Sequence, residues 1–113
     1  CVVALHHPPL RTGIAFMDAI GLENPHALEA VLAASAGPVL VVAGHVHGVY
    51  MGRLGPHPVI TAPSVCSGFA LDRRPDAPVG FFAGPTGAGV IDTAGAGSWT
   101  MLPLDHGAGP FPF

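Results

Sequence analysis

Two pairs of histidines are notable in this sequence because each follows a run of apolar residues. Gly44-His45-Val46-His47 follows residues 39–43, and His6-His7-Pro8-Pro9 follows residues 1–5. Neutral imidazole suits zinc, iron, manganese, cobalt or nickel, and histidine alone does not choose among them. Histidines two apart project to one side of an extended strand, or fan around a point where the chain turns. The spacing therefore predicts a metal site, provided that the two pairs meet.

The segments between the pairs decide whether the histidines can meet. Residues 1–5 and 39–43 have the apolar character of buried strands. Between them, Asn24-Pro25 predicts a helix that runs from Pro25 to about Ser35, before Gly37-Pro38. A strand, a crossover helix and a second strand form a unit whose parallel strands end at the same edge of the sheet. We therefore expect four histidines on one rim: His6, His7, His45 and His47.

The remaining segments are predicted to be loops and short strands. Residues 10–23 form an irregular loop with one helical turn near 14–20, and residues 63–70 a turn or loop. Five short strands are expected after the second histidine pair: 48–54, 58–62, 79–83, 89–93 and 99–104. The first two would pair around Gly55-Pro56, and the last three would form an antiparallel meander.

These elements predict a single domain at residues 1–104, followed by a Gly/Pro tail at 105–113. The domain would be α/β in its first half and β in its second. Phe111 and Phe113 in the tail are expected to dock on an apolar surface. The sequence has no initiator methionine and opens directly on a strand-like run, so we expect a piece that starts within a domain.

The composition excludes several classes of protein. Half of the 113 residues are hydrophobic and only 10% are charged, against about 25% in an average protein. Glycine and proline break every apolar run before the ~20 residues of a membrane span, so no membrane partner is expected. A net charge of −3 with four basic residues argues against nucleic acid. The apolar excess indicates surface buried against more protein, although a loop-rich β protein would show the same bias.

Not every polar residue near these motifs is expected to serve the site. Isolated histidines are usually satisfied structural residues, and three are interpreted in that way: His26, His57 and His106. Extended geometry would send His6 and His7 to opposite faces, so only one would bind metal and the other would contact substrate or support the ligands.

The aspartates show no ligand spacing, and Asp18 is interpreted as a loop or helix-start residue. Cys1 and Cys66 are expected to be buried or free thiols.

Five motifs occur in order along the chain: Leu5-His6-His7-Pro8-Pro9, Met17-Asp18, Glu23-Asn24 with Leu28, Gly44-His45-Val46-His47, and Thr61-Ala62-Pro63-Ser64. In this order they resemble the C-terminal half of the calcineurin-like metallophosphoesterases. The nearest branch contains the class III cyclic nucleotide phosphodiesterases and the glycerophosphodiesterases. The resemblance covers most of the chain and is strongest from Cys1 to about Asp72.

The resemblance implies part of a four-layer αββα sandwich of two mixed β-sheets, with two divalent metal ions (iron, manganese or zinc) on its rim. By this resemblance His6 and His45 would bind one ion and His47 the other. His7 would contact the phosphate or support a ligand, and Arg11 would contact the substrate. A hydroxide bridging the two ions would attack the phosphoester.

Three ligand blocks of that family are absent from this sequence: Asp-x-His, Gly-Asp-x-x-Asp and Gly-Asn-His. The bridging aspartate, the asparagine ligand and the histidine that assists the leaving group are absent with them. The resemblance therefore implies that the chain supplies only the C-terminal histidine ligands and is inactive alone. The N-terminal half would come from a longer polypeptide or from another chain.

The expected function is metal-dependent hydrolysis of a small phosphodiester such as a cyclic nucleotide or a glycerophosphodiester. Two alternatives stay open: a non-catalytic metal-binding or oligomerisation module, and a phosphomonoesterase or nuclease of the same superfamily. The low basic content disfavours the nuclease. A homo-oligomer is expected because half of such a domain would expose a sheet edge and an apolar face. A cytoplasmic location is expected as well.

Overall fold

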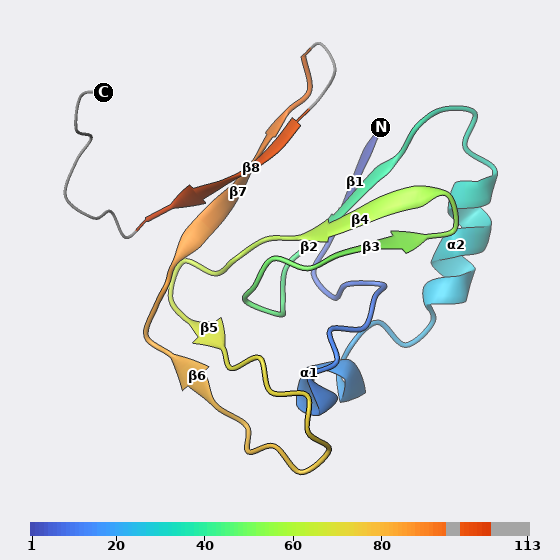
Figure 1. Ribbon diagram of the computed structural model, residues 1–113. Coiled ribbons are helices and arrows are strands. Elements are labelled where there is room, and N and C mark those ends of the chain that lie inside the picture. The colour runs from blue at the N-terminus through green and yellow to red at the C-terminus, as the bar shows by residue number, and fades with distance from the viewer. Residues whose placement is uncertain (95–97, 105–113) are drawn as a thin grey trace, which may run out of the picture.

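The computed structural model describes residues 1–94 and 98–104, and its framework is one four-stranded mixed sheet (Figure 1). The strand order is β1-β2-β4-β3. β1 (Val2–Leu5), β2 (Leu40–Ala43) and β4 (His57–Thr61) run parallel to one another, and β3 (Met51–Leu54) pairs antiparallel with β4. β2 is therefore an interior strand, whereas β1 lies at an edge.

The parallel pairing of β1 and β2 confirms the predicted crossover unit. The register joins Val2 to Leu40 and Leu5 to Ala43, so both strands end at the same level. The crossover contains the single turn α1 (Ala15–Ala19) and the helix α2 (Pro25–Ala33). The chain positions immediately after β1 and β2 are thus brought together at one edge of the sheet.

The helix α2 begins where Asn24-Pro25 predicts it. Asn24 occupies the N-cap position, although its side chain makes no capping hydrogen bond. The helix ends at Ala33, earlier than expected, because the amides of Ala34 and Ser35 bond only three residues back, to the carbonyls of Val31 and Leu32.

The core lies between α2 and one face of the sheet. Leu32 of α2 packs against Val41, which is fully buried, and against Val59 of β4. Val3, Leu5, Leu10 and Leu28 complete this cluster at its margin. The alternation along β2, half-buried then buried, follows because successive side chains point to opposite faces of the sheet.

The second half of the chain departs in part from the predicted meander. β5 (Gly68–Phe69) pairs with β6 (Phe81–Phe82), and β7 (Gly87–Asp92) forms an antiparallel hairpin with β8 (Ser98–Pro103). The three strands predicted at 79–83, 89–93 and 99–104 are present as β6, β7 and β8, but β6 does not join β7 and β8. Instead β6 pairs with β5, which lies inside the segment expected to be a turn or loop. Two residues of strand are too short to leave a periodic signal in sequence.

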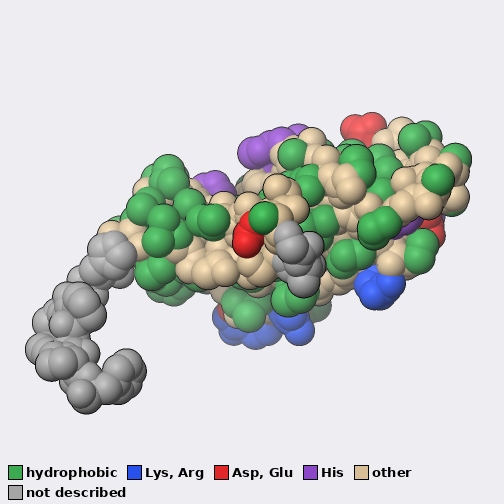
Figure 2. All heavy atoms as spheres, turned by 90° about the horizontal axis from the view of Figure 1, so that it is seen from above, with side chains coloured by type: hydrophobic (Ala, Val, Ile, Leu, Met, Phe, Trp, Pro, Cys, Tyr) green, Lys and Arg blue, Asp and Glu red, His purple; other side chains and the backbone are tan. Residues whose placement is uncertain are grey.

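The face of the sheet opposite α2 is only partly covered. Val2 at 41% exposure and the exposed Ala4 lie on it, and the hairpin residues Ile91 and Trp99 stand opposite across grooves of about 240 and 740 Å³. Hydrophobic side chains are spread over the surface seen in Figure 2, and charged groups are sparse. The fold is thus mixed α/β with mixed and antiparallel sheets, while the four-layer sandwich stays a prediction.

Candidate metal centre

The turn after β2 holds two histidines in an uncommon backbone conformation. His45 has φ 67° and His47 has φ 48°, in the left-handed region that costs an ordinary residue about 1–2 kcal/mol and that histidine enters more readily than most. Between them, Val46 is 2% exposed and packs against Ile14 and Met17. Of the two geometries open to the His-x-His pattern, the chain takes the turn, with Val46 as its anchor in the core.

The histidines after β1 meet the first histidine after β2. The His7 and His45 ring centroids are 4.4 Å apart, those of His6 and His45 are 5.1 Å apart, and those of His6 and His7 are 5.0 Å apart. One nitrogen from each of the three rings lies within 4.8 Å of the other two. The Gly44 amide also donates to the His6 carbonyl at 3.1 Å, so the strand pairing extends into the cluster and positions it.

The positions of His6 and His7 differ from the extended geometry that was expected. The chain bends at both residues directly after β1, before Pro8, so their side chains do not point to opposite faces. Both rings are exposed, and histidine side chains reach the surface in Figure 2. His7 also borders a groove of about 480 Å³ with residues 19–24, which leaves space for a ligand beside the cluster.

One nitrogen of His45 is buried without a hydrogen-bond partner among the described residues. This atom is Nε2, and the arrangement costs roughly 1–3 kcal/mol unless a partner is supplied. Burial, and then repulsion from His7, His6 and His47, lower the pKa of His45 from its usual value. The ring therefore stays neutral to lower pH, which is the form that binds a metal ion. An unpartnered imidazole nitrogen beside two further histidines fits a transition-metal ion.

His47 lies apart from this three-histidine group. Its Nδ1 is 3.0 Å from the hydroxyl oxygen of Ser67, and its ring stacks on Phe69 with centroids 4.6 Å apart. These two contacts orient the ring, and Ser67 occupies Nδ1, so a metal ion would bind at Nε2. The sequence did not identify Ser67 or Phe69 as functional residues. Ser67 lies in a loop and Phe69 in the two-residue strand β5, and neither segment carries a motif.

Ser67 belongs to a short polar chain that includes Cys66. The Cys66 thiol lies 3.1 Å from the Ser64 hydroxyl and 3.6 Å from the Ser67 hydroxyl. These hydrogen bonds, that of Ser64 first, lower the pKa of the Cys66 thiol. Both Cys66 and Cys1 are free and exposed, in agreement with the expectation of free thiols.

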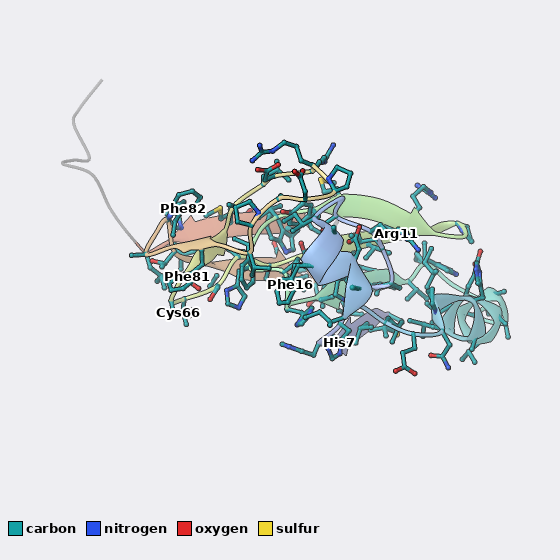
Figure 3. All side chains as sticks on the ribbon, turned by 90° about the horizontal axis from the view of Figure 1, so that it is seen from below. His7, Arg11, Phe16, Cys66, Phe81 and Phe82 are labelled. Atoms are coloured by element: carbon teal, nitrogen blue, oxygen red, sulfur yellow. The ribbon has the colours of Figure 1, made fainter. Side chains whose placement is uncertain are left out.

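Arg11 and Asp18 are not part of the histidine cluster. Both line a different groove, of about 340 Å³, with residues 8–10 and 21–23, Pro25 and His26, and Figure 3 shows the labelled Arg11 and His7 side chains apart. The Asp18 carboxylate accepts hydrogen bonds from the Thr12 amide and hydroxyl and from the Gly13 amide, at 2.8 to 3.0 Å. Asp18 lies in the first turn of α1 and closes the loop that precedes it, which agrees with the helix-start alternative of its interpretation as a loop or helix-start residue.

The histidines assigned structural roles have ordinary contacts. His57 is buried and its Nε2 lies 3.2 Å from the Leu32 carbonyl oxygen, while His26 is exposed and lies 3.6 Å from Glu29. His106, Phe111 and Phe113 lie outside the described residues. No helix in the described part of the chain is long and apolar enough to cross a membrane.

Comparison with known proteins relates this chain to phosphodiesterases, although no protein-family model matches it. It is 38% identical over 79 residues to the 3',5'-cyclic adenosine monophosphate phosphodiesterase CpdA of Pseudomonas aeruginosa, covering 64% of this chain and 29% of that protein. It is 35% identical over 81 residues to a probable cyclic nucleotide phosphodiesterase of Synechococcus, covering 71% of this chain and 30% of that protein. A probable glycerophosphodiester phosphodiesterase GpdQ of Arcobacter nitrofigilis is 33% identical over 113 residues, covering 96% of this chain and 41% of that protein.

A mixed α/β chain with a histidine cluster at the ends of parallel strands is thus a relative of phosphodiesterases. More particularly, it is homologous to the cyclic nucleotide and glycerophosphodiester phosphodiesterases of the calcineurin-like metallophosphoesterases, which confirms the resemblance of its motifs. The chain spans less than half of the length of each relative described above.

Proposed function

We propose that this chain is part of a metal-dependent phosphodiesterase and supplies the histidine side of its active site. The observation that carries the proposal is the convergence of His6, His7 and His45 at the ends of two parallel strands, with His47 on the same turn as His45. The homologous phosphodiesterases support the reaction class. The substrates proposed are small phosphodiesters, such as a cyclic nucleotide or a glycerophosphodiester.

In this proposal His6 and His45 hold one divalent ion and His47 holds a second. When bound, two such ions supply a hydroxide nucleophile at neutral pH and offset the charge of the phosphoryl oxygens. The protein holds the ligands in place: Ser67 orients the ring of His47, and the buried Val46 fixes the turn that carries both histidines. The groove beside His7 is where a phosphoester would enter.

The centre proposed here needs further ligands. The side chains that group as potential metal ligands among the described residues are all histidines, and neutral imidazoles leave the charge of two divalent ions uncompensated. We propose that carboxylate ligands come from another segment of a longer polypeptide or from another chain. The isolated 113-residue chain is then inactive.

Hydrolysis of a chromogenic phosphodiester with added Mn²⁺ tests the proposal in the full-length gene product that contains this chain. His45→Ala and His47→Ala should each reduce the rate by about 100-fold or more, because losing a ligand costs at least as much as losing its supporting hydrogen bond. His26→Ala, at an exposed position on α2, is the matched control and should retain the wild-type rate. Wild-type rates in both ligand variants would disprove the assignment.

The alternative of a non-catalytic metal-binding module is distinguished in the same material. Metal content and hydrolysis should rise together as Mn²⁺ is added if the centre is catalytic. Full metal occupancy without hydrolysis of diesters or monoesters would favour the non-catalytic module. Hydrolysis of a phosphomonoester in preference to a diester would favour a phosphomonoesterase.

A further inference from the structure

A row of three rings leads away from the histidines to the surface of the molecule. The Phe69 ring stacks on His47, with centroids 4.6 Å apart and planes inclined by 29°. Phe16 then meets Phe69 edge to face, with centroids 6.5 Å apart and planes inclined by 65°. We call His47, Phe69 and Phe16 the aromatic path. It joins α1 to β5 and to the turn after β2, and metal binding requires only its first ring.

Phe16 is the exposed end of the aromatic path. It is 39% exposed, whereas Phe69 is half-buried and Met17, the next residue of α1, is 3% exposed. The single turn α1 therefore directs Met17 into the core, where it packs with Ile14 and Val46, and presents Phe16 at the surface. Figure 3 labels Phe16 on this turn. The phenyl ring is available to a ligand that reaches the histidines.

The groove beside His7 meets the same side of α1. Ala19 and Ile20 line that groove, and they follow Phe16 by three and four residues, the spacing of neighbours on one helical face. Ile20 is 44% exposed. A phosphoester that enters beside His7 therefore has the Phe16 side of α1 next to it, so the aromatic path continues the entrance to the site.

The surroundings of Phe16 offer flat apolar contact. The hollow between Phe16, Phe69 and Val79 has a volume of about 20 Å³, room for roughly one water molecule, so a ligand group would lie over the exposed ring. The Asp72 carboxylate at its margin is engaged by the guanidinium of Arg74. Nucleobases stack on aromatic side chains, whereas the hydroxyls of a glycerol group need hydrogen-bond partners.

We propose that Phe16 stacks the nucleobase of a small phosphodiester substrate and makes the site favour nucleotide over glycerol phosphodiesters. The inference rests on the proposed function, because it concerns the substrate of the same site. The phosphoryl group would lie at the histidines, the ribose would follow the aromatic path, and the base would lie over the Phe16 ring. Phe16 is then a specificity-determining residue that takes no part in metal binding.

Hydrolysis of two substrates by the full-length gene product that contains this chain tests the inference. Phe16→Ala and Phe16→Leu should each lower the ratio of kcat/KM for 3',5'-cyclic AMP to kcat/KM for glycerophosphocholine by about 10-fold or more, the size of one base–aromatic stack. Phe16→Tyr keeps the ring and should retain the wild-type ratio. Phe82→Ala, at another exposed phenyl ring, is the matched control and should retain it as well.

Two outcomes of this comparison would overturn the inference. A wild-type ratio in Phe16→Leu would show that an apolar side chain without a ring is sufficient. A larger loss for glycerophosphocholine than for cyclic AMP would show that the ring binds the quaternary ammonium group, a known partner of aromatic faces. Equal losses for both substrates would likewise remove the specificity role and leave the proposed function standing.

A binding measurement separates the inference from the hydrolytic activity. In saturation-transfer NMR of the same protein with cyclic AMP, the adenine protons H2 and H8 should receive more saturation than the ribose protons. Phe16→Leu should lose this preference, and Phe82→Ala should keep it. Absence of the preference in the wild type would contradict the proposal. Adenine contact that depends on Phe16, without hydrolysis of any phosphodiester, would disprove the proposed function and leave the stacking role intact.

Discussion

At the scale of single residues, His45 combines two properties that substitution can separate. One is the imidazole, and the other is tolerance of a positive φ, here 67°. Asparagine shares the tolerance without the ring, whereas a β-branched residue at that φ is a strong outlier. The left-handed turn is therefore a reason for histidine that is additional to metal binding.

We expect His45→Asn to leave the free energy of unfolding within about 0.5 kcal/mol of wild type in EDTA, and to abolish metal binding. His45→Val should lower the free energy of unfolding by about 1–2 kcal/mol more than His45→Asn does, because of backbone strain. Urea unfolding followed by circular dichroism measures both. Equal stability of the two variants would show that the turn does not keep this φ in solution.

The hydroxyl of Ser67 is expected to control the ring of His47. Its oxygen lies 3.0 Å from Nδ1 of that ring, and losing a partner of this kind typically costs 10–100-fold in metal affinity. Ser67→Ala should therefore weaken the ion held by His47 by about that factor, and Ser67→Thr should restore it. Ser64→Ala is the matched control, since Ser64 bonds to Cys66 and not to His47. Metal titration of the full-length protein should separate the two variants, and equal affinity would contradict this role for Ser67.

The convergence of His6, His7 and His45 could be predicted from sequence, whereas the contacts of His47 with Ser67 and Phe69 could not. Two histidine pairs at the ends of apolar runs place His6, His7 and His45 together once the strands are parallel. The bend at His6 and His7 was missed because strand periodicity was carried past Leu5, although Pro8 and Pro9 end the strand. The partners of His47 depend on how distant loops fold back, which no local pattern encodes.

At the scale of elements, α2 keeps the ends of β1 and β2 in place by packing on the sheet. Leu32 is 7% exposed within the core, whereas its neighbour Val31 is 71% exposed. Leu32→Ala should lower the free energy of unfolding by about 2–5 kcal/mol. Val31→Ala should change it by less than about 0.7 kcal/mol, with any gain coming from helix propensity.

Chemical denaturation of the two α2 variants checks this difference directly. Because both residues lie on one helix and lose aliphatic atoms, a difference larger than their helix propensities account for reports the burial of Leu32. Leu32→Ala should also weaken metal binding, since the strand ends would lose their support. Similar stabilities for the two variants would mean that α2 does not pack on the sheet as described.

The elements that sequence predicted well are those with strong local signals. Asn24-Pro25 marks the start of α2, and two apolar runs mark β1 and β2. The pairing of β5 with β6 could not be predicted, because each contributes two residues and their association depends on contacts across the intervening loop. The meander was therefore right in its strands and wrong in one of its pairings.

At the scale of the whole molecule, the chain exposes more surface than a compact domain of its size. Its accessible surface is 7359 Å² for 11.4 kDa, against about 5,800 Å² expected for a folded monomer. Its radius of gyration is 15.7 Å, against about 13 Å for a compact 113-residue domain. Phe81 and Phe82, labelled in Figure 3, are 72% and 60% exposed. These values fit a surface that further protein covers.

We predict that the isolated chain self-associates through the uncovered sheet face and the free edge of β1. Light scattering should give a mass above that of the monomer and rising with concentration. Val2→Lys places a charge on this edge and should reduce association, whereas Val31→Lys on the outer side of α2 should not. A monodisperse wild-type monomer would contradict the prediction.

The register between β1 and β2 has a consequence for the site that neither strand reveals alone. Leu5 pairs with Ala43, and the two histidine pairs begin just beyond. A slip of one residue would move His6 by about 3.3 Å and turn its side chain to the other face. The relative position of the two histidine pairs is therefore set by the strand register to within one residue. Deleting one residue within β2 would leave every histidine in the sequence and still dismantle the centre.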